Sequence, residues 1–167
     1  MSRANGFWPV RAENGGLVAT ELIQLGASQT CLKGFALVRN SSNPEQADVA
    51  TASDTSILGV AAANRTSGAS PGDDDYIAYY PASNNTIFGG IADAAIAESQ
   101  IGDPIDLVVD TSGATDRFLV DVGASATDII RIVNLPRLGI APSNLNNERE
   151  VHFKFVNSQW AQSTETA

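Results

Sequence analysis

The feature that most constrains the fold is an alternation of apolar and polar residues over short stretches, each followed by turn-forming residues. The stretch Ile57–Gly90 shows this pattern, and Val151–Val156 shows the cleanest alternation. Within Ile57–Gly90, Tyr76, Ala78 and Tyr80 share one face, as the two-residue period of a β-strand requires. The preceding Asn64–Asp75 is rich in Ser, Gly, Pro and Asp, which favour a solvated loop. The stretch therefore predicts strands joined by polar loops.

The same alternation recurs along the chain, with turns spaced about eight to twelve residues apart, and this spacing is typical of sandwiches and barrels. We expect an all-β fold, a single barrel- or sandwich-like domain of about eight to ten short strands with extended N- and C-terminal arms and at most one short helix. The expected strands are Leu17–Leu25, Cys31–Arg39, Val49–Ala52, Ile57–Ala63, Tyr76–Tyr80, 85–90, Ile105–Asp110, Arg117–Val122, Ile129–Leu135 and Val151–Val156.

The domain organisation follows from where this pattern begins and ends. Residues 1–16 are expected to form an N-terminal arm, residues 17–156 the β-domain, and residues 157–167 a polar C-terminal tail. One element stays ambiguous. The Ala and Glu content of Ile91–Gln100 favours a short helical segment, but the preceding strand could equally continue into it.

Composition and charge exclude several classes of partner. At 167 residues the chain matches about one domain, and its formal net charge is −9 with a sequence pI near 4.4. Binding to phosphate backbones depends on Lys and Arg displacing counterions, so no nucleic-acid partner is expected. An anionic membrane surface is disfavoured for the same reason, and no apolar run approaches the length of a membrane span. The N-terminal residues also lack the apolar stretch of a signal peptide.

The residues that usually carry catalysis or bind metals are few or wrongly spaced. His152, the chain's one histidine, is expected on the outward face of a strand, and Cys31 is expected to be a small core residue. The run Asp73–Asp75 lacks the alternating spacing of a calcium loop and is expected to be a solvated acidic loop, with weak divalent binding as the alternative. We therefore expect no enzyme, catalytic residue, metal site or cofactor.

Large apolar residues near the two termini are the candidate interface residues. They are Phe7, Trp8, Pro9 and Val10 in the N-terminal arm and Trp160 in the C-terminal tail. Aromatic side chains supply much of the contact energy at interfaces, so these residues could anchor the arms on neighbouring subunits. They could equally fold back onto the domain's own core.

Several segments resemble, in the same order, the small virion proteins that decorate tailed-phage capsids. These segments read CLKGFAL, ILGVA, YIAYYPA, NTIFGG, IGDPIDL and VHFKF, and together they span roughly residues 17 to 156. The resemblance implies a decoration (cement) protein that binds the outer surface of a capsid and stabilises it by bridging neighbouring capsomers. It also implies a homotrimer, with the major capsid protein as partner, located on the virion after assembly in the host cytoplasm.

The alternative function comes from the tyrosines rather than from the resemblance. A carbohydrate-binding β-sandwich module of a fibre or host-attachment apparatus would use Tyr76, Tyr79, Tyr80 and Trp160 as a stacking platform. The two-residue period places Tyr79 on the face opposite Tyr76 and Tyr80, which disfavours a single platform.

Overall fold

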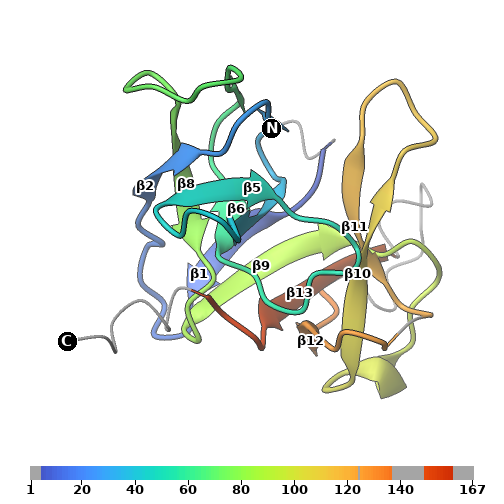
Figure 1. Ribbon diagram of the computed structural model, residues 1–167. Helices are drawn as coiled ribbons and strands as arrows, with labels where there is room; N and C mark the ends of the chain where they lie inside the picture. Colours follow the sequence, from blue (N-terminus) through green and yellow to red (C-terminus); the bar gives the residue numbers. More distant parts are fainter. Residues whose placement is uncertain (1–4, 124, 137–148, 160–167) are drawn as a thin grey trace.

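The computed structural model describes residues 5–123, 125–136 and 149–159, and within these ranges the fold is all-β (Figure 1). The expected fold class is confirmed, although the described residues form more strands than expected. The elements are β1 (Trp8–Ala12), β2 (Glu21–Leu25), β3 (Thr30–Cys31), β4 (Ala36–Arg39), β5 (Gln46–Val49), β6 (Gly59–Ala61), β7 (Arg65–Thr66), β8 (Tyr76–Pro81), β9 (Thr86–Ile91), the 3-10 turn η1 (Glu98–Gln100), β10 (Pro104–Asp110), β11 (Arg117–Asp121), β12 (Ile130–Asn134) and β13 (Glu150–Phe155).

One half of the molecule is a closed barrel with the strand order β2-β5-β4-β6-β8. Its only parallel pair is β2 with β5, and the other neighbouring strands are antiparallel. Alternate residues point into the barrel, so that Ile23 on β2 lies opposite Ile77 on β8 and Leu25 opposite Ala47 on β5. All four are buried, as the two-residue period of a strand with one face in the core requires.

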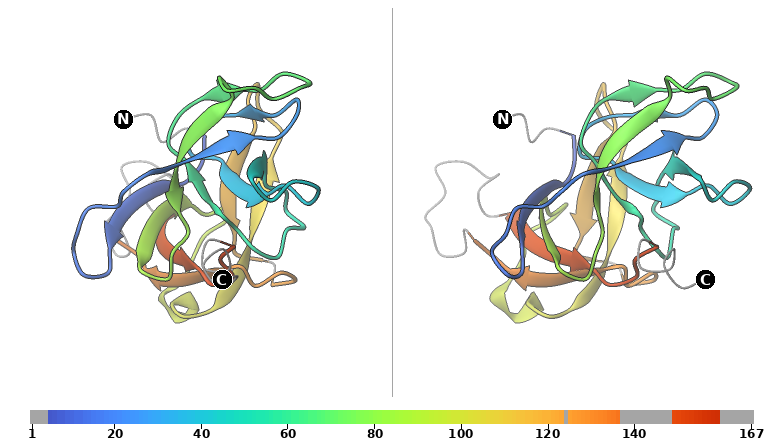
Figure 2. Two further views of the ribbon diagram at one scale, coloured as in Figure 1. Left: turned by 60° about the vertical axis from the view of Figure 1, so that its left-hand side comes forward. Right: turned by 90° about the vertical axis from the view of Figure 1, so that its left-hand side faces the viewer.

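The other half is a six-stranded sheet with the order β1-β9-β13-β12-β10-β11. This sheet curls back on itself, because Val120 on β11 forms a bridge to Ala92, the residue after β9. The backbone N–H of Asp93 donates to the carbonyl of Val120 at 2.9 Å. Figures 1 and 2 show the barrel strands β2 and β8 on one side of the molecule and the projecting β10–β11 hairpin on the opposite side.

An aromatic cluster fills the core of the six-stranded sheet. All six phenylalanines of the chain are buried, and each has a ring centroid within about 6 Å of another. The cluster draws on β9, β11 and β13 and on two residues outside the strands, so it joins distant parts of the sequence. Its members are Phe7, Phe35, Phe88, Phe118, Phe153 and Phe155.

The expectation that residues 1–16 form an arm is wrong for residues 7–12. Phe7 is 3% exposed within the aromatic cluster, and β1 pairs with β9 along the edge of the sheet. The strand was missed because its register shifts between Pro9 and Arg11, and such an irregularity breaks the two-residue period. Residues 1–4 lie outside the described part of the chain.

Further boundaries differ from expectation, since β2 begins at Glu21 rather than Leu17 and β5 spans Gln46–Val49 rather than Val49–Ala52. The expected strand Cys31–Arg39 is split into β3 and β4 by a turn at Gly34, whose φ of 98° is accessible to glycine at little cost. The boundary expected between the domain and the tail, at residue 157, is also too early. Ser158 still forms a parallel bridge to Ile57, so the chain remains paired with the domain beyond that residue. In the ambiguous stretch, β9 continues only to Ile91 and the helical segment is the single turn η1.

Candidate interaction surface

The described residues bring no nucleophile, base and acid together. His152 is half-buried, and its Nε2 lies 3.7 Å from Oε1 of Glu150. Cys31 is fully buried, and burial raises the pKa of its thiol to about 12, so the thiolate is scarce at neutral pH. The expected core position of Cys31 is therefore confirmed.

The acidic loop does not assemble a cation site in the described part of the chain, which holds no group of three or more metal-ligating side chains. Asp73 and Asp74 are exposed, whereas Asp75 accepts a hydrogen bond from the backbone N–H of Gly72 at 2.9 Å. That bond closes the loop on itself.

The described part of the chain contains no helical segment that could span a lipid bilayer.

Asp106 is a buried carboxylate whose role the sequence did not reveal. It is 4% exposed and accepts hydrogen bonds from the backbone of Ala126, Thr127 and Asp128 and from the Thr127 hydroxyl, all at 2.7–2.9 Å. Burial raises the pKa of this carboxyl, but the four hydrogen bonds outweigh burial and hold the pKa below its usual value. Because all four donors come from the β11–β12 connection, Asp106 anchors that connection rather than binding a ligand.

The residues expected at an interface are mostly integrated into the sheet. Phe7 is buried, and the indole of Trp8 lies against β9, where a Cβ at Gly89 would come within 2.3 Å of its Nε1. Pro9 and Val10 are half-buried on β1. Trp160 lies outside the described residues. Phe7 is thus a core residue, and an interface role for it is wrong.

Two exposed hydrophobic side chains lie elsewhere, on the outer surface of the barrel. Leu22 on β2 is 71% exposed and lies opposite Ala78 on β8. Tyr76 is 48% exposed, and with Tyr80 it shares the outward side of β8. We call this set of four residues the apolar face. It lies on the side of the molecule that Figure 2 turns toward the viewer in its right-hand panel.

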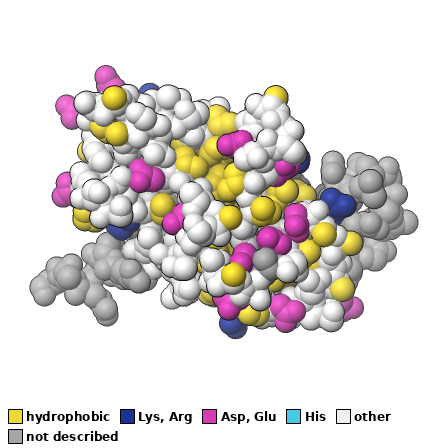
Figure 3. Space-filling model, turned by 45° about the vertical axis from the view of Figure 1, so that its right-hand side comes forward, with side chains coloured by type: hydrophobic (Ala, Val, Ile, Leu, Met, Phe, Trp, Pro, Cys, Tyr) yellow, Lys and Arg dark blue, Asp and Glu magenta, His cyan; other side chains and the backbone are white. Residues whose placement is uncertain are grey.

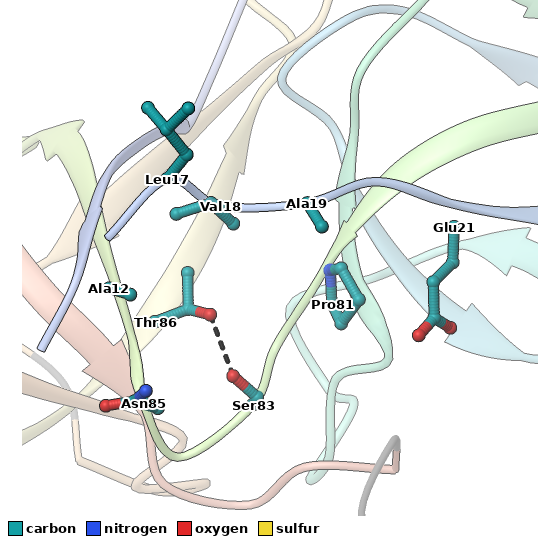
Figure 4. A pocket seen from close by; sticks show the side chains of 9 residues that line it. All are labelled: Ala12, Leu17, Val18, Ala19, Glu21, Pro81, Ser83, Asn85 and Thr86. Atoms are coloured by element: carbon teal, nitrogen blue, oxygen red, sulfur yellow. Dashed lines mark hydrogen bonds between the residues drawn. The ribbon is translucent and has the colours of Figure 1, made fainter. Parts of the chain in front are cut away.

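The connection between β1 and β2 extends the apolar surface. Leu17 is fully exposed at 100%, and Figure 4 shows its side chain pointing away from the other residues of a shallow hollow of about 230 Å³. The hollow lies between this connection and the β8–β9 turn. A 2.8 Å hydrogen bond between the hydroxyls of Ser83 and Thr86 holds that turn. The hollow is lined by Ala12, Leu17, Val18, Ala19, Glu21, Pro81, Ser83, Asn85 and Thr86.

Acidic side chains border the apolar face. The loop carrying Asp73 and Asp74 leads directly into β8 and is tied to β2 by the side chain of Gln24, which donates to the Gly72 carbonyl at 2.9 Å. Glu21 is paired with Tyr79 on the other side of β2, where it accepts a hydrogen bond from the Tyr79 hydroxyl at 3.0 Å. Chemically, the surface can bury apolar groups and attract a partner with basic groups around its contact.

The sequence did not point to this surface. Leu22 and Ile23 look alike in the sequence, and only the register of β2 with β8 determines which of them faces water. Leu17 was expected to begin the strand Leu17–Leu25, but β2 begins at Glu21, so the two-residue period did not predict the exposure of Leu17. Against known proteins, the chain matches no family model, and neither a curated protein nor a solved structure is detectably similar to it.

Proposed function

We propose that this protein is a structural virion protein that binds the outer surface of a phage capsid and stabilises the shell by bridging neighbouring capsomers as a homotrimer. The observation that carries the proposal is the apolar face together with Leu17. Leu22 and Tyr76 are exposed on the outer surface of the closed barrel, and Leu17 is exposed on the connection that leads into β2. The order of the capsid-decoration-like segments supports the same function.

The energetic argument starts from the cost of exposing hydrophobic groups. Burying a leucine side chain stabilises a contact by about 1.5–3 kcal/mol relative to leaving it in water. Leu17 and Leu22 are almost fully exposed in the single chain, so a partner that covers them gains this free energy. Contiguous exposed hydrophobic surface on a folded domain marks an interaction site.

The mechanism is adhesion rather than chemistry. A ligand that binds only the assembled shell stabilises that shell by mass action. Several copies on one shell, or several subunits of one trimer, multiply weak contacts into strong attachment. The partner is the major capsid protein, and the contact takes place on the virion after assembly in the host cytoplasm.

One tyrosine of the stacking platform that the carbohydrate-binding alternative requires is not available at the surface. Tyr79 is buried inside the barrel, with its hydroxyl bonded to Glu21, so it cannot stack against a sugar. Tyr76 and Tyr80 remain on one outward side, but Tyr80 is partly buried against the core. We therefore keep glycan binding only as an outcome that the experiments on the apolar face can reveal.

The proposal is tested by adding the purified protein to undecorated capsids and measuring co-sedimentation. Leu22→Asp should weaken binding about tenfold to a hundredfold, because it removes the contribution of one buried leucine and adds a charge. Ile101→Asp is the matched control, since Ile101 is 42% exposed and follows η1, away from β2 and β8. Equal binding by the native chain and Leu22→Asp would contradict the proposal.

A further inference from the structure

The charge of the chain is concentrated in one segment. Residues 93–128 hold eight acidic residues and one arginine, a net charge of −7 out of −9 for the whole chain. We call this the acidic segment. It includes η1, β10 and β11, and the β10–β11 hairpin projects from the body of the molecule (Figure 1). Five of its carboxylates are exposed, namely Asp93, Glu98, Asp103, Asp116 and Asp128.

The acidic segment also presents hydrophobic side chains. Val109 on β10 and Val122 after β11 are half-buried and pack at the margin of the core. In Figure 3, which turns this side of the molecule forward, hydrophobic side chains gather in a hollow and acidic side chains lie around them. The segment therefore combines apolar contact area with a negative charge.

A surface of the opposite charge lies on the six-stranded sheet. Arg131 on β12 and Lys154 on β13 are paired residues, so their side chains share one face of the sheet. His152 is two residues from Lys154 on the same face, opposite to the face that carries Phe153 and the aromatic cluster. Arg11 on β1 lies opposite Ile87 and belongs to this outer face as well.

We call Arg11, Arg131 and Lys154, together with the neighbouring His152, the cationic face. Of these residues, Arg11 and His152 line a hollow of about 490 Å³. Two acidic side chains accompany it, because Lys154 forms an ion pair with Glu13 and His152 lies near Glu150. Arg11 and Arg131 are exposed. The hollow is lined by Arg11, Glu13, Ile87, Val133, Asn134 and His152.

We propose that the acidic segment of one copy, led by the β10–β11 hairpin, docks on the cationic face of a second copy of this chain. The argument is charge complementarity. Molecules that each carry a charge of −9 repel one another, and a contact between surfaces of opposite local charge offsets this repulsion. In the described part of the chain, the cationic face and the acidic segment supply such a pair of surfaces.

The two surfaces differ, so the contact is heterologous, and each copy offers one surface of each kind. Such a contact generates a closed ring when its rotation closes and an open chain when it does not. The contact rests on the self-association in the proposed function, and it leaves the apolar face of the barrel free for the capsid.

The test uses charge reversal in the full-length chain, with sedimentation velocity at low and high salt. One variant reverses the acidic segment through Asp103→Lys and Asp116→Lys. A second reverses the cationic face through Arg11→Glu and Arg131→Glu. All four residues are exposed, so each variant should fold, which circular dichroism checks. The matched control is Asp73→Lys with Asp74→Lys on the barrel loop.

The native chain should associate at low salt and dissociate as salt rises. Each reversal should weaken association at least about tenfold, since like charges then face each other, and the chain carrying both reversals should associate again. The control should behave as the native chain. The proposal would be overturned if the native chain stays monomeric, or if the chain that carries both charge reversals stays monomeric.

Capsid binding separates this inference from the proposed function. If the contact between copies is absent but the native chain still binds undecorated capsids through Leu22, only the head-to-tail contact is wrong. If the copies associate through the two surfaces but never bind capsids, the proposed function is wrong and the contact stands.

Discussion

Replacing Phe7 by alanine tests whether the N-terminal residues belong to the core. The ring of Phe7 meets Phe153, Phe155 and Phe118 edge-on, with centroid distances of 5.0, 5.9 and 6.1 Å. Removing a buried phenylalanine costs about 3–5 kcal/mol, because apolar burial is lost and a cavity remains. For a domain of this size that lowers the Tm by roughly 6–20 °C, at about 2–4 °C per kcal/mol.

The assay is urea denaturation followed by circular dichroism, which gives the free energy of unfolding of each variant. Leu17→Ala is the control: it removes a large aliphatic side chain at a fully exposed position, so its unfolding free energy should stay within about 0.5 kcal/mol of the native value. If Phe7→Ala is as stable as the control, the N-terminal residues are an arm after all and our account of the core is wrong.

Three further predictions concern single residues. Asp106→Asn should lower the free energy of unfolding by about 1.5–3 kcal/mol at neutral pH; because the native pKa is depressed, the difference from the native chain should shrink as pH falls below about 4. Cys31 should resist a thiol reagent at pH 8 in the folded protein and react in urea, and fast native labelling would contradict its burial. Gly89→Ala should displace the Trp8 indole and shift its fluorescence to longer wavelength in a Trp160→Phe background, whereas an unchanged spectrum would place Trp8 elsewhere.

The alternation of residues predicted the strands whose inner side is buried. Phe153 and Phe155 on β13 and Phe118 on β11 are buried as expected, because burial of one face imposes the two-residue period on the sequence. The same period placed Tyr79 on the face opposite Tyr76, which the barrel confirms.

The two-residue alternation did not predict the strands correctly where strand geometry is irregular or where the paired residues are far apart in the sequence. The register shift in β1 hid an edge strand, and the turn at Gly34 divided one expected strand into two. The closure of the barrel through the parallel pair β2–β5 left no local signal, since it joins residues that are far apart in sequence.

The candidate surface was predicted least well. Aromatic residues near the termini suggested an interface there, but an apolar residue in a sequence gives no sign of whether a core or a partner covers it. Phe7 found its partners in the aromatic cluster, while Leu22 was left exposed by its place on the outer side of β2. Charge did not settle burial either, because five of the eight acidic residues of segment 93–128 are exposed whereas Asp106 is buried.

The central claim is that this protein adheres to a capsid, and quantitative mass spectrometry of purified virions tests it most directly. The copy number of this chain would be measured relative to that of the major capsid protein. Our account predicts a fixed stoichiometric ratio, as expected for a protein bound at equivalent positions of a symmetric shell. Absence of the chain from particles purified out of a culture that expresses it would contradict the account.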